Sequence, residues 1–269
     1  MKKTRYILLL IGTSVFTACQ LNKTNKLSEE SVFNELMSID SVTTEKATPK
    51  TSQIPPAIQQ KLDDPATEHY GIDISHFQGG IVSLLSKNND SLKFIICKAT
   101  QGITYIDPMF KTNWNEIHQN GFIRGAYHFY ECKDDPIAQA KHFISMIKGI
   151  QSYDIPPILD IEQGSLTKGS TAEQIQSDAL KFMEEVERAT GRKPIIYSDY
   201  GFFQKYFTDA KFAQYKLWIA EYTNAPAPRI PTVWEKVGYL VWQKSANYHA
   251  DSKQIDLDVV KGSLKKLIE

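Results

Sequence analysis

The chain has 269 residues, and its 31 lysines and arginines balance its 31 aspartates and glutamates, so the formal net charge is zero. This balance argues against nucleic acid as a partner, because nucleic-acid-binding domains carry an excess of basic residues. The length and the 42% content of hydrophobic residues fit one large domain with its own core.

The N-terminus predicts export. Basic residues precede the apolar run 6–11, which is too short to span a membrane as a mature helix and has the form of a secretory signal. Small residues lead up to Cys19, as in a bacterial lipobox. We therefore expect residues 1–19 to be a lipoprotein-type signal peptide and Cys19 to carry lipid. The protein would be exported and anchored to a bacterial outer membrane or cell envelope, facing the periplasm or the exterior. The alternative is ordinary cleavage near Ala18.

A polar stretch separates this signal from the folded part of the chain. Residues 20–68 are rich in Ser, Thr, Asn and Lys, which is typical of a tether. Within it, 31–39 can form a short helix and 58–62 can pack on the bottom of the domain. We assign the folded domain to residues 69–269.

Strand-like and helix-like segments alternate from residue 69 onward. Eight strands are predicted, at 69–75, 92–100, 122–130, 156–164, 194–198, 217–221, 239–243 and 254–258. Five helices are predicted, at 81–87, 108–119, 135–147, 170–191 and 200–207. The best-marked helix begins with a capping box at 170–173 and ends at Gly191. Eight strands and five helices, with loops joining the last strands, predict an α/β barrel of the TIM type.

The stretch 156–164 carries the clearest chemical signal. Its apolar run is bounded by prolines and a glycine and suits a buried strand, on which Asp160 and Glu162 share one face about 6.6 Å apart. Crowding like charges raises at least one pKa, so one carboxyl can stay protonated while the other is ionised. Glycoside hydrolysis needs this division of labour. An isolated pair of this kind is more often solvated and inert at the end of a strand, so the surrounding residues must show whether the pair has a catalytic role.

Carboxylates and aromatic residues dominate the other predicted strand ends, where barrels of this type place their active sites. These residues are Asp73, Ser75, Thr100, 127–129, Tyr197, Asp199, Glu221, Tyr222, Trp242, Gln243, Asp256 and Asp258. Aromatic faces stack on sugar rings, and carboxylates bind hydroxyls and transfer protons. The set therefore indicates a carbohydrate site. His128 has no second histidine or cysteine at ligand spacing, so we expect no metal and no cofactor.

Several sequence blocks resemble, in order, those of the glycoside hydrolase family 25 lysozymes, the Chalaropsis-type muramidases. They are YGIDISHFQ (70–78), KATQG (98–102), DPMFKTN (107–113), GAYHF (125–129), LDIE (159–162), LWIAEY (217–222), VWQ (241–243) and IDLD (255–258). The resemblance covers about 69–262. Two departures stand out: Gln101 replaces the usual glutamate, and 249–253 replaces a glycine-containing turn beside Asp256.

The resemblance implies a flattened barrel and hydrolysis of the β-1,4 bond between N-acetylmuramic acid and N-acetylglucosamine in peptidoglycan. It implies that Glu162 is the general acid and that Asp73, Asp160 and Asp256 are the other acids of the site. A protein nucleophile, a water molecule and the substrate's own 2-acetamido group all stay open as the attacking group.

We expect the partners to be peptidoglycan glycan strands and, through Cys19, a membrane, and we expect a monomer. Five side chains are predicted to contact the glycan: Tyr127, Tyr197, Tyr222, Trp242 and Gln243. Trp218, inside an apolar strand, is predicted to pack in the core, and Glu221 to have a structural role.

Two other functions are compatible with parts of this pattern. One is a catalytically silent protein that binds wall glycans, against which the four retained acids argue. The other is a hydrolase of another N-acetylated glycan, of the chitinase-like kind, which predicts a longer motif D-x-x-D-x-D-x-E that 156–164 lacks.

Overall fold

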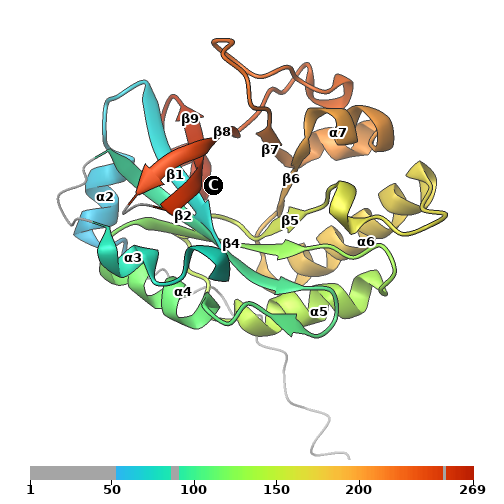
Figure 1. Cartoon of the computed structure of the whole chain (residues 1–269), viewed down its shortest axis with the longest axis horizontal. Coiled ribbons are helices and arrows are strands. Elements are labelled where there is room, and N and C mark those ends of the chain that lie inside the picture. The colour runs from blue at the N-terminus through green and yellow to red at the C-terminus, as the bar shows by residue number, and fades with distance from the viewer. Residues whose placement is uncertain (1–52, 86–90, 251–252) are drawn as a thin grey trace, which may run out of the picture. The chain divides into compact units, whose positions relative to one another are not determined.

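Eight strands form the barrel in the computed structural model, which describes residues 53–85, 91–250 and 253–269 (Figure 1). They are β1 (Glu68–Ile74), β2 (Leu92–Gln101), β4 (Ile123–Phe129), β5 (Ile158–Asp160), β6 (Ile195–Asp199), β7 (Lys216–Ala220), β8 (Val241–Ala250) and β9 (Lys253–Lys261). The ring runs β1-β9-β8-β7-β6-β5-β4-β2, and pairing of β1 with β2 closes it. The short β3 (Tyr105–Ile106) pairs with β2 alone. The predicted TIM-like barrel is confirmed.

One strand of the ring runs against the others. The strands from β1 to β8 pair in parallel around the ring, whereas β9 is antiparallel to both β8 and β1. In the pairing of β1 with β9, Asp73 faces Asp256. Asp256 therefore reaches the barrel mouth through this pairing. The sequence argument had placed it at the C-terminal end of a parallel strand, which was wrong.

Five helices match the predicted ones, and two more flank the described barrel. The five are α3 (Ile81–Leu84), α4 (Phe110–Gln119), α5 (Pro136–Met146), α6 (Ala172–Thr190) and α7 (Tyr200–Tyr206); the additional ones are α2 (Pro56–Leu62) and α8 (Lys265–Ile268). In Figure 1, α4, α5 and α6 lie along the outside of the ring. Thr171 caps α6 through a bond from the amide of Gln174 (3.3 Å), so the cap lies one residue later than the predicted box.

Packed structure is present before residue 69, the predicted start of the domain. Ile58 and Leu62 of α2 are almost fully buried against the barrel, as expected for 58–62, and β1 already begins at Glu68. The signal peptide, Cys19 and the predicted helix at 31–39 lie outside the described residues. Within the described ranges, no helix has both the length and the apolar character needed to cross a bilayer.

The inward-facing layer of the barrel changes from apolar to polar toward its mouth. One buried cluster contains the inward side chains Phe94, Ile96, Ile158, Ile195, Trp218, Val241 and Val260, together with side chains of α2 and α8. Because successive strand residues alternate between faces, the next inward positions on these strands are Lys98, Asp160, Tyr197, Gln243 and Asp258. The same alternation that fills the barrel with apolar side chains thus places polar ones at its mouth.

Candidate active site

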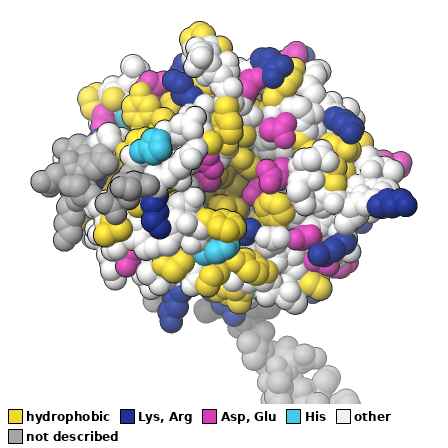
Figure 2. Space-filling model, in the orientation of Figure 1, with side chains coloured by type: hydrophobic (Ala, Val, Ile, Leu, Met, Phe, Trp, Pro, Cys, Tyr) yellow, Lys and Arg dark blue, Asp and Glu magenta, His cyan; other side chains and the backbone are white. Residues whose placement is uncertain are grey.

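The barrel mouth contains a cleft of ≈ 330 Å³. Its lining residues are Asp73, Ile74, Ser75, Phe77, Gln78, Lys98, Tyr127, Phe129, Asp160, Glu162, Tyr197, Trp218, Tyr222, Gln243 and Asp256. Figure 2 shows a hollow near the centre of this face, with acidic and hydrophobic side chains at its border. All four acids predicted from the sequence lie in this one cleft.

One side of the cleft, which we call the β5 wall, consists of Asp160 and Glu162. Strand β5 ends at Asp160 and is shorter than predicted, because a 3₁₀ turn begins at Gln163. The backbone of Glu162 is nevertheless extended, and the amide of Ile161 donates to the carbonyl of Tyr197 (3.1 Å). The strand direction therefore continues past β5, and both carboxylates border the cleft.

The β5 wall combines burial with charges of both signs. Burial, together with the negative charge of Asp199, raises the pKa of Glu162 above its ordinary value. Burial and the neighbouring Glu162 raise the pKa of Asp160 well above its ordinary value, and the ammonium of Lys98 opposes this shift. A carboxyl that holds its proton at the edge of a cleft is suited to general acid catalysis.

The opposite side, which we call the β1/β9 wall, consists of Asp73 and Asp256, and the buried Asp258, which does not line the cleft, is hydrogen-bonded to Asp73. Burial and the charge of Asp256 raise the pKa of Asp73 to about 8. Burial also raises the pKa of Asp256. Asp258 is fully buried below them, accepts a hydrogen bond from Trp218 Nε1 (2.8 Å), and has its pKa raised well above normal by burial and by Asp73. From the sequence, Asp258 was predicted among the strand-end residues but not among the four acids of the site, and in the structure it supports the wall without lining the cleft.

Gln243 connects the tyrosines to the β1/β9 wall. Its Nε2 donates to Asp73 Oδ2 (2.7 Å), and its Oε1 accepts from the hydroxyls of Tyr197 (2.9 Å) and Tyr222 (2.9 Å). Tyr222 is exposed at the rim, whereas Gln243 is buried. With Tyr127, these three side chains border the cleft, as predicted for substrate contacts.

Trp242 lies elsewhere, which corrects its predicted role. Its side chain is fully buried, and its Nε1 donates to the carbonyl of Glu221 (2.8 Å). Side chains alternate along β8, so the inward position of Gln243 turns Trp242 outward toward the helices. The indole at the cleft floor belongs to Trp218, which had been predicted as core alone.

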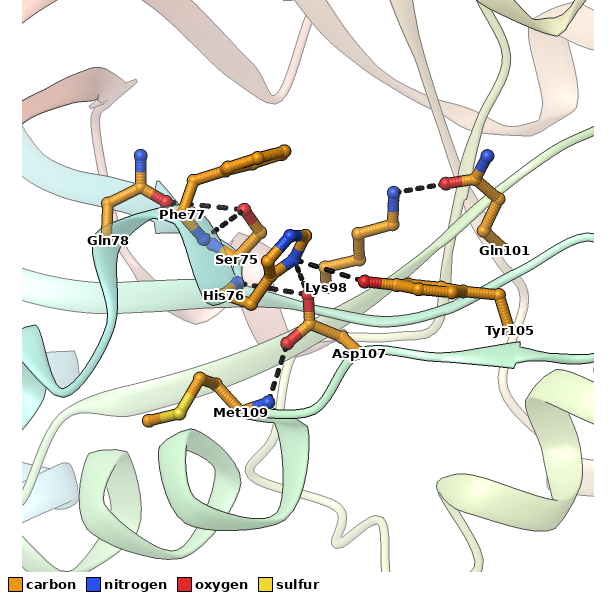
Figure 3. Close-up of polar contacts among 9 residues, drawn as sticks. All are labelled: Ser75, His76, Phe77, Gln78, Lys98, Gln101, Tyr105, Asp107 and Met109. Carbon is orange, nitrogen blue, oxygen red and sulfur yellow. Dashed lines mark hydrogen bonds and ion pairs between the residues drawn. The ribbon is translucent and has the colours of Figure 1, made fainter.

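Phe77 and Lys98 are among the cleft residues that were not assigned from the sequence. Phe77 is 79% exposed at the rim, and only its position in the 70–78 block pointed to it. Lys98 had been noted only as part of the 98–102 block. The structure pairs its Nζ with Gln101 Oε1 (2.6 Å) and places it over the ring of Phe129 (4.7 Å). Figure 3 shows Lys98 and Gln101 in this arrangement.

The departures from the family pattern have local consequences. Gln101 bridges Lys98 and Glu131, because its Nε2 donates to Glu131 Oε1 (2.6 Å). Strands β8 and β9 continue as a long hairpin up to the pair Ala250 and Lys253, where a short turn is usual. His128 is buried and bonded to Thr100 and Gln139. In the described part of the chain, no group of three or more His, Cys, Asp or Glu side chains could hold a metal.

Comparison with known proteins identifies the family. The profile described as "Glycosyl hydrolases family 25" matches residues 72–253. The chain belongs to glycosyl hydrolase family 25. It is 31% identical to the uncharacterized protein YegX of Escherichia coli K12 over 205 residues, covering 74% of this chain and 71% of that one. It is 29% identical to lysozyme M1 of Streptomyces globisporus over 208 residues, covering 74% and 69%.

Solved structures of family 25 share the fold. A family GH25 lysozyme from Aspergillus fumigatus has a TM-score of 0.66 and 29% identity, and the match covers 75% of this chain and 98% of that one. A bacterial lysozyme from Streptomyces coelicolor also has a TM-score of 0.66, with 28% identity and coverage of 74% and 95%. The predicted membership of family 25 is thereby confirmed.

Proposed function

We propose that this family 25 protein is a muramidase that hydrolyses the β-1,4 bond between N-acetylmuramic acid and N-acetylglucosamine in peptidoglycan. The observation that carries the proposal is the position of Glu162, half-buried with a raised pKa, in a cleft shared with Asp73, Asp160 and Asp256. The three lysozymes among the similar proteins support the same substrate.

The walls of the cleft would perform different steps. Glu162 would protonate the glycosidic oxygen as the bond breaks. Asp160 lies on the same wall, and, although burial raises its pKa, the ionised form that Lys98 favours would stabilise the oxocarbenium-like transition state. Asp73 and Asp256 would accept hydrogen bonds from the sugar that is cleaved, and Tyr127, Tyr197 and Tyr222 would contact its rings and substituents.

Identification of the new reducing end tests this proposal. The protein is incubated with purified peptidoglycan, the released ends are reduced, and the sugar alcohols are identified by mass spectrometry. A muramidase produces muramitol. A new N-acetylglucosaminitol end would assign a different bond specificity, and the absence of product, with retained sedimentation on peptidoglycan, would assign a glycan-binding protein.

We also propose, from the sequence alone, that the chain is exported and lipid-anchored through Cys19. The apolar run 6–11 and the small residues before Cys19 support it. Metabolic labelling with an alkyne fatty acid should label the wild-type chain in the membrane fraction. The Cys19→Ser variant should lose the label, and a variant that keeps it would refute the site.

A further inference from the structure

A second hollow adjoins the catalytic cleft. It measures ≈ 370 Å³, and Phe77 and Lys98 line both spaces, so the two adjoin at these side chains. Its lining residues are His76, Phe77, Lys98, Gln101, Gly102, Ile103, Thr104, Tyr105, Glu131, Lys133 and Asp134. We call it the side hollow; Figure 3 shows several of its side chains.

The first side of the hollow is held in place by a buried carboxylate. Asp107 is 1% exposed, and its Oδ2 accepts from the backbone amide of His76 (3.0 Å) and lies 2.8 Å from His76 Nδ1. The hydroxyl of Tyr105 lies 3.2 Å from the same ring nitrogen, and Phe77 packs on the imidazole with ring centroids 4.1 Å apart. These contacts fix the orientation of three rings before any ligand binds (Figure 3).

The second side depends on a close approach of two loops at Gly102. This residue has φ +53°, and a Cβ there would lie 2.7 Å from Asp134 Oδ2 and 3.2 Å from Glu131 Cγ. Its amide donates to the carbonyl of Phe129 (3.2 Å). Glycine thus lets the loop after β4 close against the turn after β2, which forms the charged side of the hollow.

Exposed apolar side chains concentrate around this hollow. The described residues include seven exposed large hydrophobic side chains, and four of them lie on this part of the surface: Phe77 (79%), Ile103 (44%), Tyr105 (39%) and Ile106 (45%). Such concentrations on a soluble domain mark binding surfaces. The ligand of the side hollow must therefore offer apolar groups as well as polar ones.

The hollow also presents fixed charges of both signs. The side chain of Lys133 is 60% exposed and lies 3.4 Å from Glu131 Oε2, and Asp134 follows directly in sequence. The sugars of the glycan backbone bear no formal charge, since the carboxyl of muramic acid is amide-linked to peptide. The peptide stem, in contrast, combines alanine methyl groups, free carboxylates and, in many walls, the ammonium of a diamino acid.

We propose that the side hollow binds the peptide stem of peptidoglycan, so that this enzyme recognises peptide-substituted glycan. In this arrangement Lys133 pairs with a stem carboxylate, Asp134 and Glu131 face a stem ammonium, and the apolar side chains contact the alanines. The inference rests on the proposed function, because a muramidase brings the lactyl group of muramic acid, and its stem, to the cleft.

The test compares two soluble substrates with the same glycan backbone. One keeps its peptide stems, and the other has been stripped by an amidase and its freed lactyl carboxylates have been converted to amides, so that its backbone stays uncharged. For the full chain and its Lys133→Glu variant, kcat/KM is measured on both. The substitution replaces an attraction for the stem carboxylate by a repulsion, and we expect the preference for the peptide-bearing substrate to fall by about fivefold. An equal loss on both substrates would show that the hollow binds sugar, and an unchanged ratio would show that it does not bind the stem. Either result overturns the proposal.

A matched control and a binding experiment separate this inference from the proposed function. Lys181 on α6 is exposed and paired with Asp178 (2.8 Å), much as Lys133 is paired with Glu131, but it lines neither space. Lys181→Glu should leave the substrate preference unchanged. If the wild type cleaves neither substrate, the muramidase proposal fails. Calorimetry with an N-acetylmuramyl tripeptide and with N-acetylmuramic acid then tests whether the side hollow binds the peptide stem. Lys133→Glu should then weaken binding of the tripeptide alone, and equal binding by wild type and variant would overturn the inference.

Discussion

The β5 wall and the β1/β9 wall of the cleft are both acidic but are assembled differently. Asp160 and Glu162 are two residues apart in sequence, and one extended segment presents both. Asp73 and Asp256 come from the first and last strands of the ring and meet only because β9 is antiparallel to β1. The first wall is local in sequence, whereas the second exists only once the barrel has closed.

The two walls also differ in the groups that surround their carboxylates. On the β5 wall, charged neighbours act on the acids, since Lys98 favours the ionised form of Asp160 and Asp199 disfavours that of Glu162. On the β1/β9 wall the hydrogen-bond donors are neutral groups of Gln243, Trp218 and Tyr222. The carboxyl pKa values are raised on both walls, so the neutral donors distinguish the β1/β9 wall and suit it to holding the sugar, while the β5 wall, with the half-buried Glu162, is suited to proton transfer.

The largest effect is expected from removing the acid of the β5 wall. Glu162→Gln keeps the size of the side chain but cannot deliver a proton, so kcat should fall by about 10²–10⁴-fold. The melting temperature should stay near that of the wild type. Reducing-end release from peptidoglycan measures the rate, and Glu184→Gln, an exposed site on α6, is the control. Near-normal turnover would show that Glu162 is not the general acid, and the acid would then have to be a residue of the β1/β9 wall.

A smaller effect, on stability as well as activity, is expected on the β1/β9 wall. Gln243→Met removes the hydrogen bonds that Gln243 makes with Asp73, Tyr197 and Tyr222 in the barrel mouth. The free energy of unfolding should fall by about 1–3 kcal/mol, which lowers the melting temperature by about 2–4 °C per kcal/mol. Thermal unfolding measures it. Gln214→Met removes an exposed amide bonded to Lys193 and should cost little; equal losses would contradict the role of Gln243.

The fold and the β5 wall were predictable because their signals are local. Strand alternation, helix caps and the pair Asp160 and Glu162 can all be recognised within short windows of sequence. The position of Gln243 in the cleft followed from its place at the end of a predicted strand. What could not be found locally was the reversal of β9, because an antiparallel closing strand has the same alternation as a parallel one. The burial of Asp258 depends on that reversal.

The error at Trp242 has a similar origin. A tryptophan at the end of a barrel strand was assigned to the sugar site by residue type, whereas the face it occupies is set by register. Gln243 and Trp242 are neighbours, so only one can point inward, and the polar residue does so. Phe77 and Lys133 could not be assigned from sequence for another reason, since the hollow they line forms between loops that follow three different strands.

The pH dependence of stability should distinguish Asp73, on the β1/β9 wall, from Asp63, an acid on the surface. The pKa of Asp73 is about 8 in the folded protein, above the ordinary value of about 3.9 expected in the unfolded chain. The folded state therefore binds this proton more tightly, and its stabilisation is complete below pH ~4 and lost as pH rises to ~8. Asp73→Asn should flatten the fall in melting temperature over this window. Asp63→Asn is the control. The hydrogen bond from Lys265 lowers the pKa of Asp63, so this substitution should change the melting temperature only at acidic pH. A slope of melting temperature against pH that is unchanged in Asp73→Asn would show that Asp73 is ionised throughout this window.

The smallest expected effect isolates the charge that Asp199 places beside Glu162. Asp199 caps α7 through a bond from the amide of Phe202 (2.9 Å), and asparagine caps equally well, so Asp199→Asn removes only the charge. Because this charge raises the pKa of Glu162, its loss should lower that pKa. A general acid works protonated, so the alkaline limb of the kcat profile should move to lower pH while the acid limb and KM change little. Asp209→Asn, at the cap of the 3₁₀ turn Ala210–Gln214, is the matched control. Coincident profiles for wild type and Asp199→Asn would mean that burial alone sets the acidity of the β5 wall.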